Sequence, residues 1–328
     1  MIRRSLAIVL ALSCVLILGT GTVNAAPIPP EAPRATRLVT GMQSGSGSTI
    51  GPDGALYVTE GATGRVLRVN PVTGKLSTFA RGLPKSIIGI GGAMDVAFIG
   101  RTAYVLVTLV GPDVGGTDVV GIYRVNGPHS FTVLANIGRF SILHPPPPNI
   151  VIAVPSGLQY AMQPYGDGFL VTDGHHNRVL SVGLDGKITQ LIQFHDIVPT
   201  GLAVWGNTIY MAEAGQVPHL PQNGKIVSFK TKSPTAAQVA AGAPLLVDVE
   251  FGPGRSLYGL SQGHFTPGHE PGTPADPNTG SLVKAKRDGT FTVITGGLDR
   301  PTSLEFIGNT AYVVTLTGEI WKIDGVAH

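Results

Sequence analysis

One strand pattern recurs along this chain of 328 residues and constrains its fold more than any other feature. The pattern is an apolar pair, a glycine turn, a strand with an aromatic or aliphatic anchor, a loop, and a further alternating strand. The clearest copies are 54–60 followed by 65–69, and 168–173 followed by 178–182. One such unit cannot bury its own apolar face, so repeated units must stack against one another.

The number of anchors gives the number of units. Spacings of 47, 66, 40, 48 and 54 residues separate six anchors: Tyr57, Tyr104, Leu170, Tyr210, Tyr258 and Tyr312. Such spacings are typical of propeller blades that carry insertions. The sequence therefore predicts an all-β, six-bladed β-propeller, with two open sheets or a sandwich as the alternative.

The two ends of the repeat region predict how the ring closes. The last repeat has expected strands at 303–307, 311–314 and 319–323, after which the chain ends without a fourth strand. Residues 36–41 resemble the expected outer strand at 290–296 and have no inner strands before them. We expect this N-terminal strand to complete the last blade, because closure removes exposed sheet edges. Helix is expected only at 234–241, where alanine is frequent.

The first 25 residues are typical of an export signal. Arg3 and Arg4 precede an apolar run at 5–18, and small residues at 23–25 suit cleavage. An uncleaved anchor and a twin-arginine signal are the alternatives. The predicted organisation is a signal peptide at 1–25, a linker at 26–35 and the propeller at 36–328. We therefore expect a secreted or extracytoplasmic monomer with no membrane span after cleavage. Its only cysteine, Cys14, would be removed.

Charge and composition exclude several function classes. Without Arg3 and Arg4 the chain has 21 basic and 20 acidic residues, with no run of like charge. Nucleic-acid binding is therefore not expected. No Gly-x-Ser-x-Gly, His-Glu-x-x-His or phosphate-loop motif occurs, so hydrolysis through a covalent intermediate has no support.

Each blade is expected to have four strands, A to D, with A nearest the channel. Propeller geometry places the D–A and B–C connections on one face and the A–B and C–D turns on the other. Seven of the nine histidines fall in the first group, which also contains the long insertions. Loops on one face of a rigid scaffold commonly carry binding sites. The candidate residues of this ligand-binding face are Glu60, Asp173, His175, His176, His264 and His269. As alternatives, Glu60 pairs with Arg65, Asp173 pairs with Arg178, and the histidines are ordinary polar loop residues.

Other carboxylates are candidate ligands of a metal ion in the channel. Alignment of the anchors puts Asp95 and Asp248 at the start of inner strands, and Glu213 at the end of a second strand. A ring of oxygen donors suits a hard divalent cation such as calcium or magnesium. Local pairing without a metal is the alternative.

Three motifs carry a family resemblance over nearly all of the propeller. The segments 51–60, 173–179 and 199–204 resemble NHL and SMP-30-like propellers. Residues 233–239 before 251–258 are similar to the ScyD/ScyE family of exported propellers, which is named after scytonemin biosynthesis. The resemblance to SMP-30-like lactonases implies a channel cation, with Asp95, Glu213 and Asp248 in analogous positions. The Glu-Gly-Pro-x-Trp motif of those lactonases is absent, which argues against the same activity.

These observations favour an exported, ScyD/ScyE-like binding or scaffold protein that holds a small ligand or a partner protein at its loop-rich face. A divalent cation in the channel is compatible with that role. A metal-dependent lactonase or hydrolase, with a loop histidine as base, is the alternative. A protein-interaction module is a third. Whether the chain is an enzyme stays open from sequence alone.

Overall fold

A computed structural model describes residues 32–150, 154–266, 268 and 273–327. The predicted signal peptide, most of the predicted linker, Cys14 and His269 lie outside the described residues. From Ala32 onward the chain forms one compact unit. No helix within its described part is long and apolar enough to cross a membrane.

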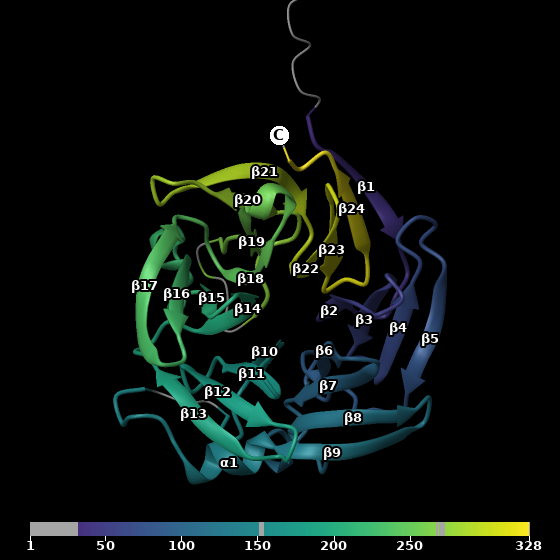
Figure 1. The fold of residues 1–328 in the computed structure, drawn as a ribbon, viewed down its shortest axis with the longest axis vertical. Helices are drawn as coiled ribbons and strands as arrows, with labels where there is room; N and C mark the ends of the chain where they lie inside the picture. The colour runs from purple at the N-terminus through teal and green to yellow at the C-terminus, as the bar shows by residue number, and fades with distance from the viewer. Residues whose placement is uncertain (1–31, 151–153, 267, 269–272, 328) are drawn as a thin grey trace, which may run out of the picture. The chain divides into compact units, whose positions relative to one another are not determined.

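Six four-stranded antiparallel sheets stand around a central channel, which confirms the predicted six-bladed propeller (Figure 1). In blades 1 to 5, strands A to D follow in chain order from the channel outward, whereas the outer strand of blade 6 comes from the N-terminus. Blade 1 is β2 (Ser48–Ile50), β3 (Leu56–Glu60), β4 (Arg65–Val69) and β5 (Leu76–Arg81). Blade 2 is β6 (Gly92–Ile99), β7 (Thr102–Thr108), β8 (Gly121–Gly127) and β9 (Ser130–Asn136). Blade 3 is β10 (Gln159–Tyr165), β11 (Gly168–Asp173), β12 (Arg178–Gly183) and β13 (Ile188–Gln193).

The other three blades follow the same plan. Blade 4 is β14 (Pro199–Trp205), β15 (Thr208–Glu213), β16 (Lys225–Lys230) and β17 (Ser233–Ala241). Blade 5 is β18 (Leu246–Phe251), β19 (Leu257–Ser261), β20 (Gly280–Ala285) and β21 (Phe291–Leu298). Blade 6 is β22 (Pro301–Ile307), β23 (Thr310–Thr315), β24 (Ile320–Asp324) and the N-terminal β1 (Arg34–Val39).

The N-terminal strand closes the ring as predicted. Strand β1 pairs antiparallel with β24, from Arg34 opposite Asp324 to Val39 opposite Ile320, with a bulge near Val39. Figure 1 shows β1 as the outer strand of the last blade, beside the C-terminal segment. The first and last strands of the ring therefore share one sheet, and β1 covers the edge that β24 would otherwise expose.

The predicted helix at 234–241 is wrong. These residues form the outer strand β17, which pairs with β16 from Lys225 opposite Ala241 to Lys230 opposite Ser233. Hydrogen bonding to a neighbouring edge outweighs the modest intrinsic preference of alanine for helix. The longest helix in the described residues is instead α1 (Ile137–Leu143), whose first turn is capped by the Asn136 side chain on the Arg139 N–H at 2.8 Å.

The anchors found in the sequence pack between blades. Tyr57 contacts Phe98 of blade 2 edge to face, with ring centroids 4.8 Å apart. Tyr210 contacts Phe251 of blade 5 in the same way at 5.1 Å. Tyr57 and Tyr210 thus each join their own second strand to the inner strand of the following blade. Because these aromatic pairs bury large apolar areas, they explain why the anchor recurs in every unit.

The connections fall on two faces. The A–B and C–D turns, with the strand residues next to them, form what we call the turn face. The B–C and D–A connections form the loop face, which contains α1 and the three-residue helices η1 (Pro112–Val114) and η2 (Pro221–Asn223). The histidines of the described loops lie in the connections expected from the sequence.

Candidate functional site

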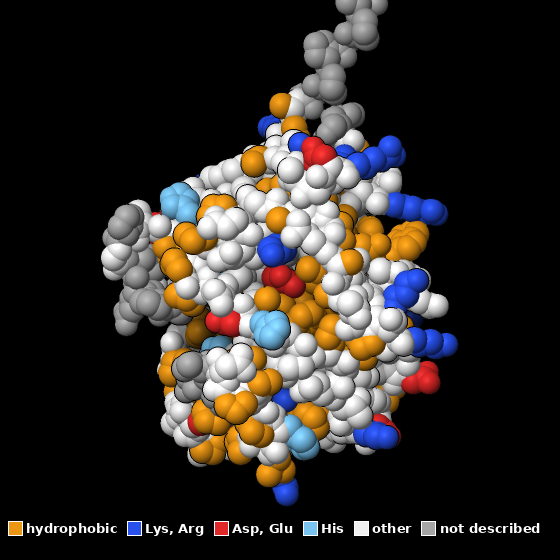
Figure 2. All heavy atoms as spheres, turned by 90° about the vertical axis from the view of Figure 1, so that its left-hand side faces the viewer, with side chains coloured by type: hydrophobic (Ala, Val, Ile, Leu, Met, Phe, Trp, Pro, Cys, Tyr) orange, Lys and Arg blue, Asp and Glu red, His pale blue; other side chains and the backbone are white. Residues whose placement is uncertain are grey.

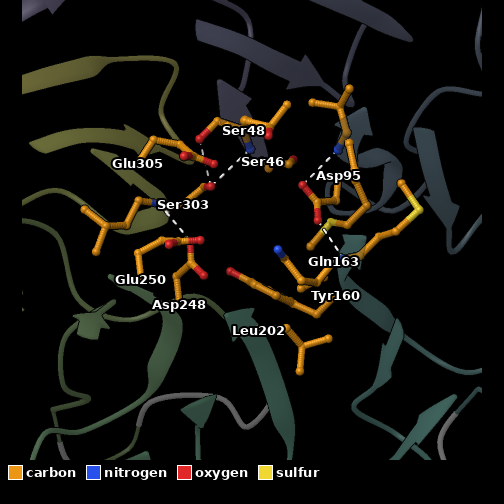
Figure 3. A pocket seen from close by; sticks show the side chains of 18 of the residues that line it. Ser46, Ser48, Asp95, Tyr160, Gln163, Leu202, Asp248, Glu250, Ser303 and Glu305 are labelled. Carbon is orange, nitrogen blue, oxygen red and sulfur yellow. Dashed lines mark hydrogen bonds between the residues drawn. The ribbon is translucent and has the colours of Figure 1, made fainter. Parts of the chain in front are cut away.

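The inner strands surround a cavity of about 220 Å³ in the turn-face half of the channel (Figure 3). Four carboxylic acids line it: Asp95 from β6, Asp248 and Glu250 from β18, and Glu305 from β22. None of the described residues that line it is a Lys, Arg or His. We call this cavity the acidic chamber.

Asp95 and Asp248 clamp neighbouring blades together. Asp95 accepts the Met162 N–H of blade 3 at 2.7 Å, and its other oxygen accepts the N–H of Val96 at 2.8 Å. Asp248 makes the equivalent bonds to Leu304 of blade 6 at 2.7 Å and to Val249 at 2.8 Å. Backbone N–H groups that would otherwise be unpaired at the channel wall are thereby satisfied.

The inner strands approach each other so closely at the two aspartates that only glycine fits beside them. A Cβ on Gly47 would lie 2.2 Å from Asp95 Oδ1, and one on Gly201 would lie 2.3 Å from Asp248 Oδ1. Both glycines belong to the preceding blade. The same glycine–aspartate contact therefore occurs on opposite sides of the ring.

Glu250 and Glu305 are functional candidates that the sequence analysis missed. Glu250 lies two residues after Asp248, which the sequence predicts at the channel, and Glu305 lies two residues after Ser303, where the first strand of the last repeat is expected to begin. Since side chains alternate along a strand, residues two apart face the same way. Applying this alternation along the expected inner strands would have found both glutamates.

The acidic chamber favours protonated carboxylic acids. Burial raises the pKa of Asp248 to about 7. Burial, together with the neighbouring charge of Asp248, raises the pKa of Glu250 to about 8. The pKa values of Asp95 and Glu305 are raised by burial and by the other carboxylates. Loss of water and mutual repulsion both oppose ionisation here.

Tyr160 forms the boundary between the acidic chamber and the loop-face half of the channel. It projects from β10 of blade 3 and donates a hydrogen bond to the Thr302 carbonyl of blade 6, the opposite blade, at 3.2 Å. Figure 3 shows its side chain reaching into the channel. Tyr160 and Thr302 line the cavities on both sides.

A second cavity, which we call the vestibule, has a volume of about 250 Å³ on the loop face. No Asp, Glu, Lys or Arg lines it among the described residues. Its walls are largely apolar and include Leu158, Val198, Pro199, Leu245, Val247 and Leu316. Its polar side chains include His175, His219, Gln262 and Tyr160.

Both histidines of the vestibule are neutral groups. Burial lowers the pKa of His175 and of His219. Because His219 Nδ1 lies 2.7 Å from the Gly215 carbonyl, this nitrogen carries the proton and donates it. The Nε2 atom of neutral His219 is consequently a hydrogen-bond acceptor. His175 Nδ1 is buried and has no hydrogen-bond partner among the described residues.

Glu60 and Asp173 form local ion pairs, as the alternative interpretation proposed. Glu60 binds Arg65 with Nη2–Oε2 at 2.5 Å. Asp173 is fully buried with Arg178 at 3.3 Å and with His176 Nδ1 at 3.1 Å. Burial alone would raise the pKa of Asp173, but its hydrogen bonds with His176 and Ser141 and the nearby Arg178 guanidinium lower it. Both acids tie a B–C loop to its own blade.

The structure separates the remaining candidates. Glu213 is buried but does not line the acidic chamber with Asp95 and Asp248, and burial raises its pKa to about 7. His264 is exposed and does not line the vestibule. Within the described residues, no three His, Cys, Asp or Glu side chains are placed to hold one metal ion. We therefore derive no reaction step through a metal.

Comparison with known proteins establishes the fold. No family model matches the sequence, and no curated protein matches it significantly. A gluconolactonase of Xanthomonas campestris is 12% identical with a TM-score of 0.62, over 89% of each chain. A virginiamycin B lyase of Staphylococcus aureus is 13% identical with a TM-score of 0.56, over 89% of this chain and 98% of that one.

The PQQ-bound aldose sugar dehydrogenase of Streptomyces coelicolor is also similar, at 13% identity and a TM-score of 0.57 over 90% of this chain and 99% of that one. The chain shares a fold with these proteins. Their differing activities show that the six-bladed scaffold supports several chemistries, so the function must be argued from the site.

Proposed function

We propose that this propeller is a binding protein that holds a small, uncharged and largely apolar ligand in the vestibule. The observation that carries the proposal is a cavity of about 250 Å³ whose described lining has no ionic side chain. Cavities with apolar walls and a few polar groups are typical ligand sites. This proposal gives the loop-rich face the binding role expected from the sequence.

The polar groups of the vestibule define the ligand further. His219 Nε2 can accept a hydrogen bond, and the Tyr160 oxygen, which already donates to Thr302, can accept another. A ligand that presents a hydroxyl or an N–H on an apolar body would satisfy these acceptors. A carboxylate or phosphate would find no cationic side chain in the described lining to compensate its loss of water.

A matched pair of probes tests this proposal. We expect 2-naphthol to bind more tightly than 2-methylnaphthalene, because only the former donates a hydrogen bond. The difference should be about fivefold to tenfold, the effect of one such bond. Binding is measured by fluorescence polarisation for 2-naphthol and by competition for its methyl analogue.

Variants locate the probe. Ala62 is exposed and lines the vestibule, so Ala62→Trp should fill the cavity without disturbing the core and should abolish binding. Ala327→Trp, at another exposed alanine outside the lining, is the control and should bind normally. Equal binding by both variants, or no binding by wild type, would contradict a vestibule site.

We also propose a family and a cellular location for the protein. The motifs at 233–239 and 251–258 support a ScyD/ScyE-like protein, and the N-terminal pattern supports export. Fractionation of the producing cells, with antibody detection of the chain lacking residues 1–25, tests the export.

A divalent cation and lactone hydrolysis form the second candidate function. Four carboxylates in one chamber without a nearby cationic side chain favour a bound cation, and the fold is shared with a gluconolactonase. In this case the ligands would come from Asp95, Asp248, Glu250 and Glu305, and these side chains would have to move closer together, since no three of them surround one position in the described structure. The cation would polarise a carbonyl group.

A further inference from the structure

Basic residues gather on the turn face of the ring, although they are spread along the sequence from residue 34 to residue 322. Four of them repeat at one structural position, directly opposite an anchor tyrosine in the strand pairing: Arg68, Arg124, Lys284 and Lys322 face Tyr57, Tyr104, Tyr258 and Tyr312. Since blades are related by rotation about the channel, a repeated position forms a ring. The fold therefore turns a scattered set of residues into one basic surface.

The turns add further positive charge to this surface. Among the described residues the turn face contains thirteen Lys and Arg but only five acids outside the channel. The basic residues are Arg34, Arg68, Lys75, Arg101, Arg124, Lys187, Lys230, Lys232, Arg255, Lys284, Lys286, Arg287 and Lys322, and the acids are Asp53, Asp167, Asp185, Asp288 and Asp324.

The loop face has no such excess. Its described residues include eight basic and nine acidic side chains. Figure 2 shows the ring from the side, with Lys and Arg along one edge and few along the opposite edge. The four acids of the acidic chamber lie inside the channel, and burial raises the pKa of Asp248 to about 7 and of Glu250 to about 8. They therefore cancel only part of the basic charge at neutral pH.

Large apolar side chains protrude between the basic residues. Val72 in a turn of blade 1 is 79% exposed, and Leu184 in a turn of blade 3 is 40% exposed. Trp205 ends β14 of blade 4 and is 47% exposed, with the Arg255 guanidinium 4.8 Å above its ring. Tryptophan next to arginine is typical of side chains that lie at the level of lipid headgroups.

We propose that the turn face docks on a bilayer with anionic headgroups. The net positive charge matches the negative surface, and the protruding Val72, Leu184 and Trp205 match the apolar region below the headgroups. A soluble polyanion would account for the charge but not for the apolar side chains at the tips of turns. The opposite face, with the vestibule, would then point away from the membrane.

Vesicle binding tests the proposal with the chain from Ala32, because residues 32–327 contain every strand of the ring and the apolar run at 5–18 would bind lipid by itself. We expect co-sedimentation with vesicles of phosphatidylcholine containing about 30% phosphatidylglycerol, weakening as salt rises above about 0.1 M. Pure phosphatidylcholine vesicles should bind far less.

Two double variants with the same change in net charge locate the contact. Lys187→Glu with Lys232→Glu changes exposed turn-face residues, and Lys85→Glu with Arg139→Glu changes exposed loop-face residues. Each basic residue near an anionic surface strengthens binding about fivefold. The turn-face variant should therefore bind at least about 25-fold more weakly, and the loop-face variant close to normally. Trp205→Ser should also weaken binding, and the fluorescence of Trp205 should shift to the blue when wild type binds.

Three outcomes would overturn the proposal. The first is equal binding to both kinds of vesicle, and the second is an equal loss of vesicle binding in the two double variants. The third is a chain that binds heparin through the turn face but does not bind vesicles. The last outcome would identify a soluble polyanion as the partner. The circular dichroism and melting temperature of each variant show that the ring has formed.

Discussion

At the residue scale, the channel aspartates combine two roles. Asp95 and Asp248 each accept backbone N–H groups from two residues, yet burial still raises their pKa values. Removal of water from a carboxylate therefore outweighs two hydrogen bonds. This balance allows the acidic chamber to take up protons near neutral pH.

The raised pKa values predict a dependence of stability on pH. Burial raises the folded-state pKa of Glu250 to about 8 and that of Asp248 to about 7. The contribution of the two protonated acids to the free energy of unfolding is therefore complete near pH 4 and is lost as the pH rises towards 8. We expect the melting temperature to fall between pH 6.5 and pH 8.5. The fall should be smaller in Glu250→Gln with Glu305→Gln, since glutamine resembles the protonated acid.

The histidines make the choice of pH range important. The lowered pKa values of His175 and His219 act in the opposite direction, removing stability as pH falls below their ordinary value of 6.5. Melting is therefore compared from pH 6.5 upward by calorimetry. An identical fall in wild type and the glutamine variant would show that the chamber acids do not titrate in this range.

At the element scale, short polar contacts join neighbouring blades. The Thr59 hydroxyl of blade 1 donates to the Met94 carbonyl of blade 2 at 2.9 Å, and the Thr200 hydroxyl of blade 4 donates to Leu246 of blade 5 at 2.8 Å. Aromatic anchors add apolar contacts farther out. A blade is thus stable only against its neighbours, as expected for a repeat architecture.

Strand β1 is the element on which closure of the ring depends. Deleting 34–41 should expose the edge of β24 and lower the melting temperature by more than about 10 °C, several kcal/mol for a domain of this size. Appending the same residues after Ala327 should restore much of the loss, because Arg34 lies opposite Asp324 and a hairpin could form. Calorimetry measures both effects. Failure of the appended strand to restore stability, or no effect of the deletion, would contradict closure by β1.

At the scale of the whole molecule, the acidic chamber exists only when the ring is complete. Its acids come from blades 2, 5 and 6, and the bond from Ser48 N–H to Ser303 Oγ at 3.0 Å joins the first and last blades beside it. A cation held there would therefore bind the folded ring and not the open chain. Such binding stabilises the folded state by mass action.

Elemental analysis distinguishes the two candidate functions. If a cation is held in the chamber, protein purified without chelator should contain about one divalent ion per chain. Glu250→Gln with Glu305→Gln should lose it, and Glu213→Gln, which removes a buried carboxylate outside the chamber lining, should keep it. Absence of metal from wild type would remove the lactonase candidate and leave the vestibule proposal. Loss of metal in Glu213→Gln alone would move the site away from the chamber.

The sequence by itself determined the number of blades, their strand order and the closing role of β1. These features can be predicted because the anchor, the glycine turn and the alternating strand occur together within each repeat and recur from one repeat to the next. It also placed the histidines on the loop face, because strand order fixes where each connection lies. The helix expected at 234–241 failed because pairing of β17 with β16 depends on a neighbouring strand and not on alanine content.

Only the tertiary structure decided which residues meet. The acidic chamber brings together carboxyl groups that are up to 210 residues apart in the chain, from Asp95, Asp248, Glu250 and Glu305. Glu213 also has a carboxyl group but does not line the chamber. The division of the channel by Tyr160, the uncharged vestibule and the basic turn face likewise arise from the rotation of blades about one axis. Each depends on side chains from different blades, and the distances between blades are set by packing of the closed ring.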